Sequence, residues 1–110
     1  MTRLFPKTPK HLTEASRQQQ VISYLQTRDW VVKQTEGTIL SHGWPDLYVA
    51  HVRHGQRWIE MKVPGGKLRE TQIRFITDFE LAGVGVWVLE AATPEQYARL
   101  FKPPNWRNYL

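Results

Sequence analysis

Residues 46–62 read DLYVAHVRHGQRWIEMK, two runs of strand-forming residues on either side of a short polar turn. The β-branched and aromatic residues predict one strand over residues 46–52 and a second over residues 56–63. Between them, Arg53-His54-Gly55 has the length of a three-residue hairpin loop whose glycine takes the left-handed bulge position. We therefore expect these residues to form an antiparallel hairpin.

The charged residues of this hairpin are spaced to meet on one face. Glu60 and Lys62 are two residues apart, so their side chains point to the same side of the second strand. Counting back from the expected loop places Tyr48 opposite Glu60 and Asp46 opposite Lys62. Two carboxylates and one amine are thus expected to converge.

A pair of neighbouring carboxylates suits a divalent cation. Two like charges at contact distance repel by about 1 kcal/mol in water and by several times more near a protein surface, and a cation between them removes that penalty. Oxygen ligands select Mg²⁺ or Mn²⁺ over zinc, and the main-chain carbonyl of Met61 is placed to add a ligand. A lysine beside the ion can stabilise charge on a phosphate or position the attacking water. The pattern favours metal-assisted hydrolysis of a phosphodiester.

The same residues also have a simpler interpretation. Aspartate before a strand is a common turn residue, and a Glu-x-Lys pair on an exposed strand is usually just solvated. However, the neighbouring residues Trp58, Ile59 and Val63 are apolar, which argues against a freely solvated strand.

The rest of the chain alternates helical and strand patterns. Prolines and basic residues mark residues 1–12 as a basic arm, after which Thr13 is placed to cap a helix. The expected elements are a helix over 14–28, a strand over 30–34, the hairpin, a helix over 69–82, a strand over 84–89, a short helix over 94–101 and a C-terminal tail over 102–110. Since residues 84–89 are apolar on both faces, they are expected to pair in parallel. The order α-β-β-β-α-β-α predicts an α/β protein.

Helical spacing and residue type also predict which side chains form the core. The residues expected to point inward are Ala15, Val21, Ile22, Leu25, Trp30, Ile73, Phe75, Ile76, Phe79 and Trp87. Trp106 is expected at the periphery.

Composition narrows the class of protein. With 110 residues and a mass of 12.9 kDa, residues 1–110 are expected to form one domain. A net charge of +5 and a pI near 9.8 favour a polyanionic partner. The absence of cysteine excludes a disulfide scaffold, a thiolate zinc site and a cysteine nucleophile. The longest apolar run is too short to span a membrane and the first residues have no apolar signal core, so an intracellular protein without a membrane partner is expected.

A family resemblance rests on three segments: Gly43-Trp44-Pro45-Asp46-Leu47, Trp58-Ile59-Glu60-Met61-Lys62 and the later Gln72. Together they resemble the PD-(D/E)XK nuclease superfamily and, more narrowly, the VRR-NUC family, over roughly residues 13–89. The resemblance implies a restriction-endonuclease-like core, a mixed four-stranded sheet flanked by helices. It also implies a metal-dependent deoxyribonuclease, an endonuclease that uses Mg²⁺, with Mn²⁺ as a substitute, and no organic cofactor.

The resemblance assigns a role to each matching residue. Asp46 and Glu60 match the metal-binding carboxylates, and Lys62 matches the catalytic lysine. Gln72 matches a glutamine that supports the site from the following helix. Glu14, at the start of the first helix, matches an acidic residue that often completes the site, although the helix dipole alone also favours glutamate there.

Two residues depart from the family pattern. Trp44 stands where a small residue usually precedes Pro-Asp, which indicates either stacking on a base or packing. Arg69 stands where a capping serine or threonine is common, which predicts a weaker helix cap and a possible phosphate contact.

DNA is the expected partner. Lys67, Arg69 and Arg74 flank the predicted site, and Lys7 and Lys10 on the arm are placed to reach along the backbone. A homodimer is expected, because small stand-alone members of the family and junction resolvases of this fold pair in that way.

Three functions stay open at this point. The first is a general DNA endonuclease and the second is a resolvase specific for branched or junction DNA. The third, from another class, is a nucleic-acid-binding module without catalysis, although the intact set of Asp46, Glu60 and Lys62 argues against it.

Overall fold

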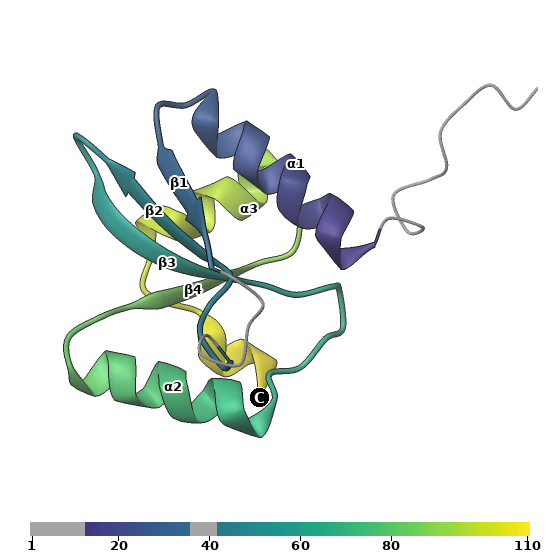
Figure 1. Cartoon of the computed structure of the whole chain (residues 1–110), viewed down its shortest axis with the longest axis vertical. Helices are drawn as coiled ribbons and strands as arrows, with labels where there is room; N and C mark the ends of the chain where they lie inside the picture. The colour runs from purple at the N-terminus through teal and green to yellow at the C-terminus, as the bar shows by residue number, and fades with distance from the viewer. Residues whose placement is uncertain (1–12, 36–41) are drawn as a thin grey trace, which may run out of the picture.

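The computed structural model of the chain describes residues 13–35 and 42–110 (Figure 1). Its elements are α1 (Glu14–Gln26), β1 (Val31–Gln34), β2 (Leu47–His51), β3 (Gly55–Met61), α2 (Glu70–Leu81), β4 (Val86–Leu89), α3 (Pro94–Ala98) and the 3₁₀ turns η3 (Arg99–Phe101) and η4 (Trp106–Tyr109). The predicted order α-β-β-β-α-β-α is confirmed. The predicted arm, with Lys7 and Lys10, lies outside the described residues. Among the described helices, none has the length and apolar character needed to cross a membrane.

The four strands form one mixed sheet in the order β1-β2-β3-β4. The first three strands pair antiparallel, and β4 pairs parallel to β3. A parallel neighbour requires a crossover, and α2 supplies it. The predicted α/β fold with a mixed four-stranded sheet is therefore confirmed, and it is consistent with a restriction-endonuclease-like core.

Helices cover both faces of the sheet, so each face has its own core. In Figure 1, α1 and α3 lie on one side and α2 and η4 on the other. The first core joins α1 to the inward residues of β2 and β3, including Leu47, Ile59 and Met61. The second core joins Ile76 of α2 to Val88. Alternation along β3 therefore points Glu60 toward α2, opposite to Ile59 and Met61.

The first helix begins as predicted and ends two residues early. Thr13 Oγ1 accepts a hydrogen bond from the Ser16 amide at 3.0 Å. The helix stops at Gln26 because residues 27–29 form a turn in which Asp29 has φ 72°. The inward position of Ala15 is wrong: the residue is exposed, because the first turn of α1 projects beyond the sheet (Figure 1).

The hairpin turn lies one residue earlier than predicted. The turn residues are 52–54, and Gly55, with φ 84°, is already paired with His51. His51 Nδ1 accepts a hydrogen bond from the Arg53 amide at 3.0 Å, which closes the turn on this side. The left-handed position was predicted correctly, but its place in the ladder was not.

This earlier turn changes the partners across the hairpin. Tyr48 pairs with Trp58 rather than with Glu60, and the last pair is Leu47 with Ile59. One residue beyond that pair, Asp46 comes beside Glu60 rather than Lys62. A shift of two residues keeps every side chain on its predicted face, because the strand period is two. Asp46, Glu60 and Lys62 therefore share one face as predicted, although the predicted register is wrong.

The segment predicted as a tail is packed onto the sheet. Trp106 and Tyr109 are buried in the second core, so the peripheral position of Trp106 is wrong. The Asn105 side chain accepts from the Val88 amide at 2.7 Å and donates to the Val88 carbonyl at 3.0 Å. Because β4 is an edge strand, this side chain satisfies peptide groups that a fifth strand would otherwise bind.

We expect Asn105→Ala to destabilise the protein by about 1–3 kcal/mol, since it leaves both peptide groups of buried Val88 without this partner. Urea unfolding would measure the change. The matched control is Asn108→Ala, which truncates an exposed asparagine of the same segment and should shift stability by less than about 0.5 kcal/mol. Equal stability of the two variants would show that the segment is not anchored through Asn105.

Candidate active site

The predicted charged residues meet where β3 ends beneath the start of α2. Asp46 directly precedes β2, Glu60 is near the end of β3, and Lys62 directly follows it. Gln72 is the third residue of α2. Glu60, Gln72 and Lys62 are only 2%, 4% and 8% exposed, so these polar groups are as buried as the core around them.

Gln72 links Glu60 of β3 to Lys62, which follows the strand. Its Nε2 donates to Glu60 Oε2 at 2.7 Å, and its Oε1 accepts from Lys62 Nζ at 3.0 Å. The Lys62 amine also lies 3.6 Å from Glu60 Oε2. The predicted supporting role of Gln72 thus corresponds to a defined position between the carboxylate and the amine. Both polar ends of the amide are used, which fixes its orientation.

Asp46 is fixed by backbone contacts from both sides. Its Oδ2 accepts a hydrogen bond from the Met61 amide at 2.8 Å. Its carbonyl accepts from the Thr35 amide at 2.9 Å and from the Thr35 hydroxyl at 3.1 Å. That hydroxyl also reaches the Pro45 carbonyl at 2.9 Å. Thr35, which belongs to none of the sequence motifs, positions Asp46; its local signal is a threonine directly after a strand.

Burial makes ionisation of the two carboxyl groups difficult. Burial first, and then repulsion from Asp46, raise the pKa of Glu60 to about 8, although the Lys62 amine opposes the shift. Burial also raises the pKa of Asp46, against the opposing effect of its hydrogen bond from Met61. Glu14 contributes to both shifts, so the structure brings this predicted residue within electrostatic range of the pair.

The predicted DNA-binding cations do not all face the site. The positive charge of Arg69 partly opposes the raised pKa of both carboxyl groups, which places it nearby. Arg74 is exposed and two residues beyond inward-facing Gln72, so it projects from the opposite side of α2. Lys67 lies in the loop between β3 and α2 and lines a neighbouring hollow.

The departure at Arg69 has the expected effect on the helix cap. An arginine side chain has no acceptor, and it makes no capping hydrogen bond to the first turn of α2. The reciprocal bond is present, because Gln72 Oε1 accepts from the Arg69 amide at 2.9 Å. Gln72 therefore helps to start the helix as well as to hold the charged groups.

Trp44 packs beside the site as part of an aromatic cluster. Its ring meets those of Trp58 and Phe79 edge to face, each at 5.5 Å between centroids, and lies 5.8 Å from Phe75. The ring stays 38% exposed. The preceding Gly43 has φ 87°, and a Cβ there would come within 2.6 Å of the Phe75 ring. Only glycine fits this position, so the turn into Pro45-Asp46 is fixed by packing.

The donor set fits a magnesium ion better than zinc. Within the described ranges, no group of three or more histidine, cysteine, aspartate and glutamate side chains is arranged to hold a metal. The site instead offers two adjacent carboxylates, Asp46 and Glu60, whose repulsion a cation would relieve. Mg²⁺ is usually bound by one or two carboxylates while water and substrate phosphates complete its shell. The residues present fit that arrangement.

A mixed sheet that presents Pro-Asp, Glu-x-Lys and a helical glutamine at one buried site defines a nuclease-like α/β domain. The family model described as VRR-NUC domain matches residues 6–93. The chain belongs to the VRR-NUC family, as its sequence predicted. Neither a search of curated proteins nor a search of solved structures gave a match.

We expect Glu60→Gln to stabilise the metal-free protein at alkaline pH. Because the pKa of Glu60 is raised to about 8 from 4.5, the folded protein holds this proton more tightly than the unfolded chain does. The resulting stabilisation is complete below about pH 4.5 and is lost as the pH rises to about 8. Urea unfolding in EDTA near pH 9 should find the variant more stable, by on the order of 2 kcal/mol.

The control for this measurement is Asp78→Asn, which neutralises an exposed acid on α2. Near pH 9 its stability should be close to that of the unsubstituted protein, because the side chain is exposed. A pH dependence that Glu60→Gln leaves unchanged would contradict the burial of an ionisable Glu60.

Proposed function

We propose that this domain is a Mg²⁺-dependent endonuclease that hydrolyses DNA phosphodiester bonds, with Mn²⁺ as a substitute ion. The observation that carries the proposal is the buried contact of Gln72 with both Glu60 and Lys62, beside Asp46. A buried carboxylate and amine are costly to maintain for stability alone, since apolar residues of similar size often serve as well. Their retention next to a second carboxylate supports a catalytic role.

Each residue has a distinct part in the proposed chemistry. Asp46 and Glu60, with the carbonyl of Met61, would hold the ion, which supplies Lewis-acid activation of the phosphate and an acidified water. Lys62, oriented by Gln72, would stabilise the charge that develops on the reacting phosphate. Because the amine is already fixed, little reorganisation is needed when that charge appears.

The proposed substrate is branched or junction DNA, and the proposed active form is a homodimer. A net charge of +5 supports binding to a phosphate backbone. Residues 13–35 and 42–110 of each copy provide one such site, whereas symmetric cleavage of two strands requires two. Light scattering should therefore give about twice the chain mass, and a mass near 12.9 kDa with or without DNA would contradict the dimer.

Two variants separate ion binding from charge stabilisation within the site: Asp46→Asn and Lys62→Ala. Asp46→Asn should abolish cleavage, because it weakens the proposed ion site. Lys62→Ala keeps both carboxylates and should lower the cleavage rate by about 10²–10³, the effect of losing one positioned electrostatic group. The measurement is cleavage of supercoiled, linear and four-way-junction DNA with Mg²⁺ and with EDTA.

The control variant is Arg53→Ala, at the hairpin turn far along β3 from Glu60, which should cleave like the unsubstituted protein. Near-normal cleavage by Asp46→Asn or Lys62→Ala would rule out the proposed active site. If the protein bound DNA and cleaved none of the substrates with Mg²⁺ or Mn²⁺, it would instead be a nucleic-acid-binding module.

A further inference from the structure

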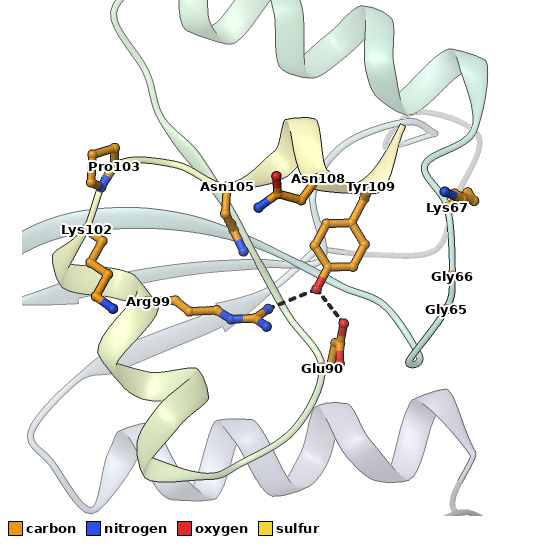
Figure 2. Close-up of a pocket in the computed structure, with 10 residues that line it drawn as sticks. All are labelled: Gly65, Gly66, Lys67, Glu90, Arg99, Lys102, Pro103, Asn105, Asn108 and Tyr109. Atoms are coloured by element: carbon orange, nitrogen blue, oxygen red, sulfur yellow. Dashed lines mark hydrogen bonds between the residues drawn. The ribbon is translucent and has the colours of Figure 1, made fainter.

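A hollow of about 420 Å³ lies next to the candidate active site, at the end of β4 (Figure 2). One wall is the Gly65-Gly66-Lys67 loop that follows β3. The other wall comes from the C-terminal segment, which contributes Arg99, Lys102 and Asn108. Its volume is in the range of pockets that hold small ligands.

The loop that forms one wall of this hollow packs on Lys62. A Cβ built on Gly66 would lie 3.6 Å from Lys62 Cδ and only 2.9 Å from the Val63 carbonyl, so the loop backbone packs on the lysine stem. On the neighbouring strand, the Lys62 amide donates to the Leu89 carbonyl at 3.0 Å, and the next residue, Glu90, lines the hollow. The two sites therefore share a wall.

Positive charge dominates the lining. The lining contains three basic residues, Lys67, Arg99 and Lys102, and one acid, Glu90. The Glu90 carboxylate accepts a hydrogen bond from the Tyr109 hydroxyl. The same hydroxyl accepts from Arg99 Nη1 at 2.9 Å, as Figure 2 shows.

The arginine is held in place and the lysines are available. Arg99 Nη1 also reaches the Val88 carbonyl at 3.2 Å, so the guanidinium is fixed before any ligand arrives. Both Lys67 and Lys102 are exposed, and within the described part of the chain neither amine contacts an acid or an acceptor. A hollow lined by a fixed guanidinium and two available amines suits a phosphate group.

We propose that this hollow is a second phosphate subsite, which holds a backbone phosphate of the DNA strand next to the bond cut at the candidate active site. The proposal rests on the proposed function, because it takes DNA as the ligand. Residues 94–110, which supply Arg99 and Lys102, lie beyond the stretch that the family model matches. These two lining residues therefore lie outside the matched nuclease domain, whereas Lys67 lies inside it.

Salt-dependent DNA binding tests the subsite without relying on cleavage. In EDTA, fluorescence anisotropy with a short duplex and a four-way junction gives the slope of log affinity against log salt. Lys102→Gln should weaken binding several-fold and reduce the magnitude of that slope by about 0.7–0.9, the value for one lost phosphate contact. Glu90→Gln should tighten binding, because it keeps a hydrogen-bonding side chain but removes the negative charge.

Charge-matched controls lie away from the hollow. Arg53→Gln at the hairpin turn and Glu95→Gln on α3 remove one positive and one negative charge, and both should leave affinity and slope nearly unchanged. Equal effects of Lys102→Gln and Arg53→Gln would overturn the subsite and leave the proposed nuclease standing. Failure of the unsubstituted protein to bind DNA would overturn both.

A free nucleotide carries the same phosphate group as a DNA strand and is therefore the other ligand to test in this hollow. Deoxyadenosine 5′-monophosphate is the probe, titrated by calorimetry into the unsubstituted protein and Lys102→Gln. Weak or absent binding together with the DNA effects above supports a strand subsite. Tight, Lys102-dependent binding of the mononucleotide with no effect on DNA affinity would overturn it.

Discussion

The hydrogen bonds that Gln72 makes to Glu60 and Lys62 hold the charged end of β3 against α2. An unpaired carboxylate or amine at this depth would be strongly destabilising, whereas one amide with a donor and an acceptor satisfies both. The same amide oxygen receives the Arg69 amide and so fixes where α2 begins. Helix position, sheet position and site geometry therefore depend on one side chain.

One face of the sheet is an apolar core and the other carries the charged site, because Gln72 holds Glu60 against α2. Ile59 and Met61 pack with α1 in an ordinary apolar core, while Glu60 between them points the other way. Burial opposes its ionisation, so the charged form of Glu60 that would hold a cation is unfavourable without one. A site that is unfavourable without its ligand is a common cost of function.

Local periodicity predicted which face of the sheet each side chain occupies. It did not predict the strand register or the packing of the C-terminal segment, which depend on longer-range contacts. The alternation of Glu60 and Lys62 gave the correct face even though the predicted pairing was displaced by two residues, because a displacement of two leaves the face unchanged. The displacement itself depends on how the turn closes at His51 and Gly55. Gln72 was found through the family motif, since its spacing to β3 has no local periodicity. The packing of the C-terminal segment was missed because a side-chain bond from Asn105 to an edge strand leaves no pattern in neighbouring residues.

Glu60 is a buried carboxyl group with a raised pKa, and we propose that a divalent cation displaces its proton. Calorimetric titration with Mg²⁺ near pH 7, repeated in buffers of different ionisation enthalpy, counts the protons released on binding. With the pKa of Glu60 at about 8, binding should release about one proton per ion near pH 7 and almost none near pH 10. Absence of Mg²⁺ binding, or binding with no proton release near pH 7, would contradict it.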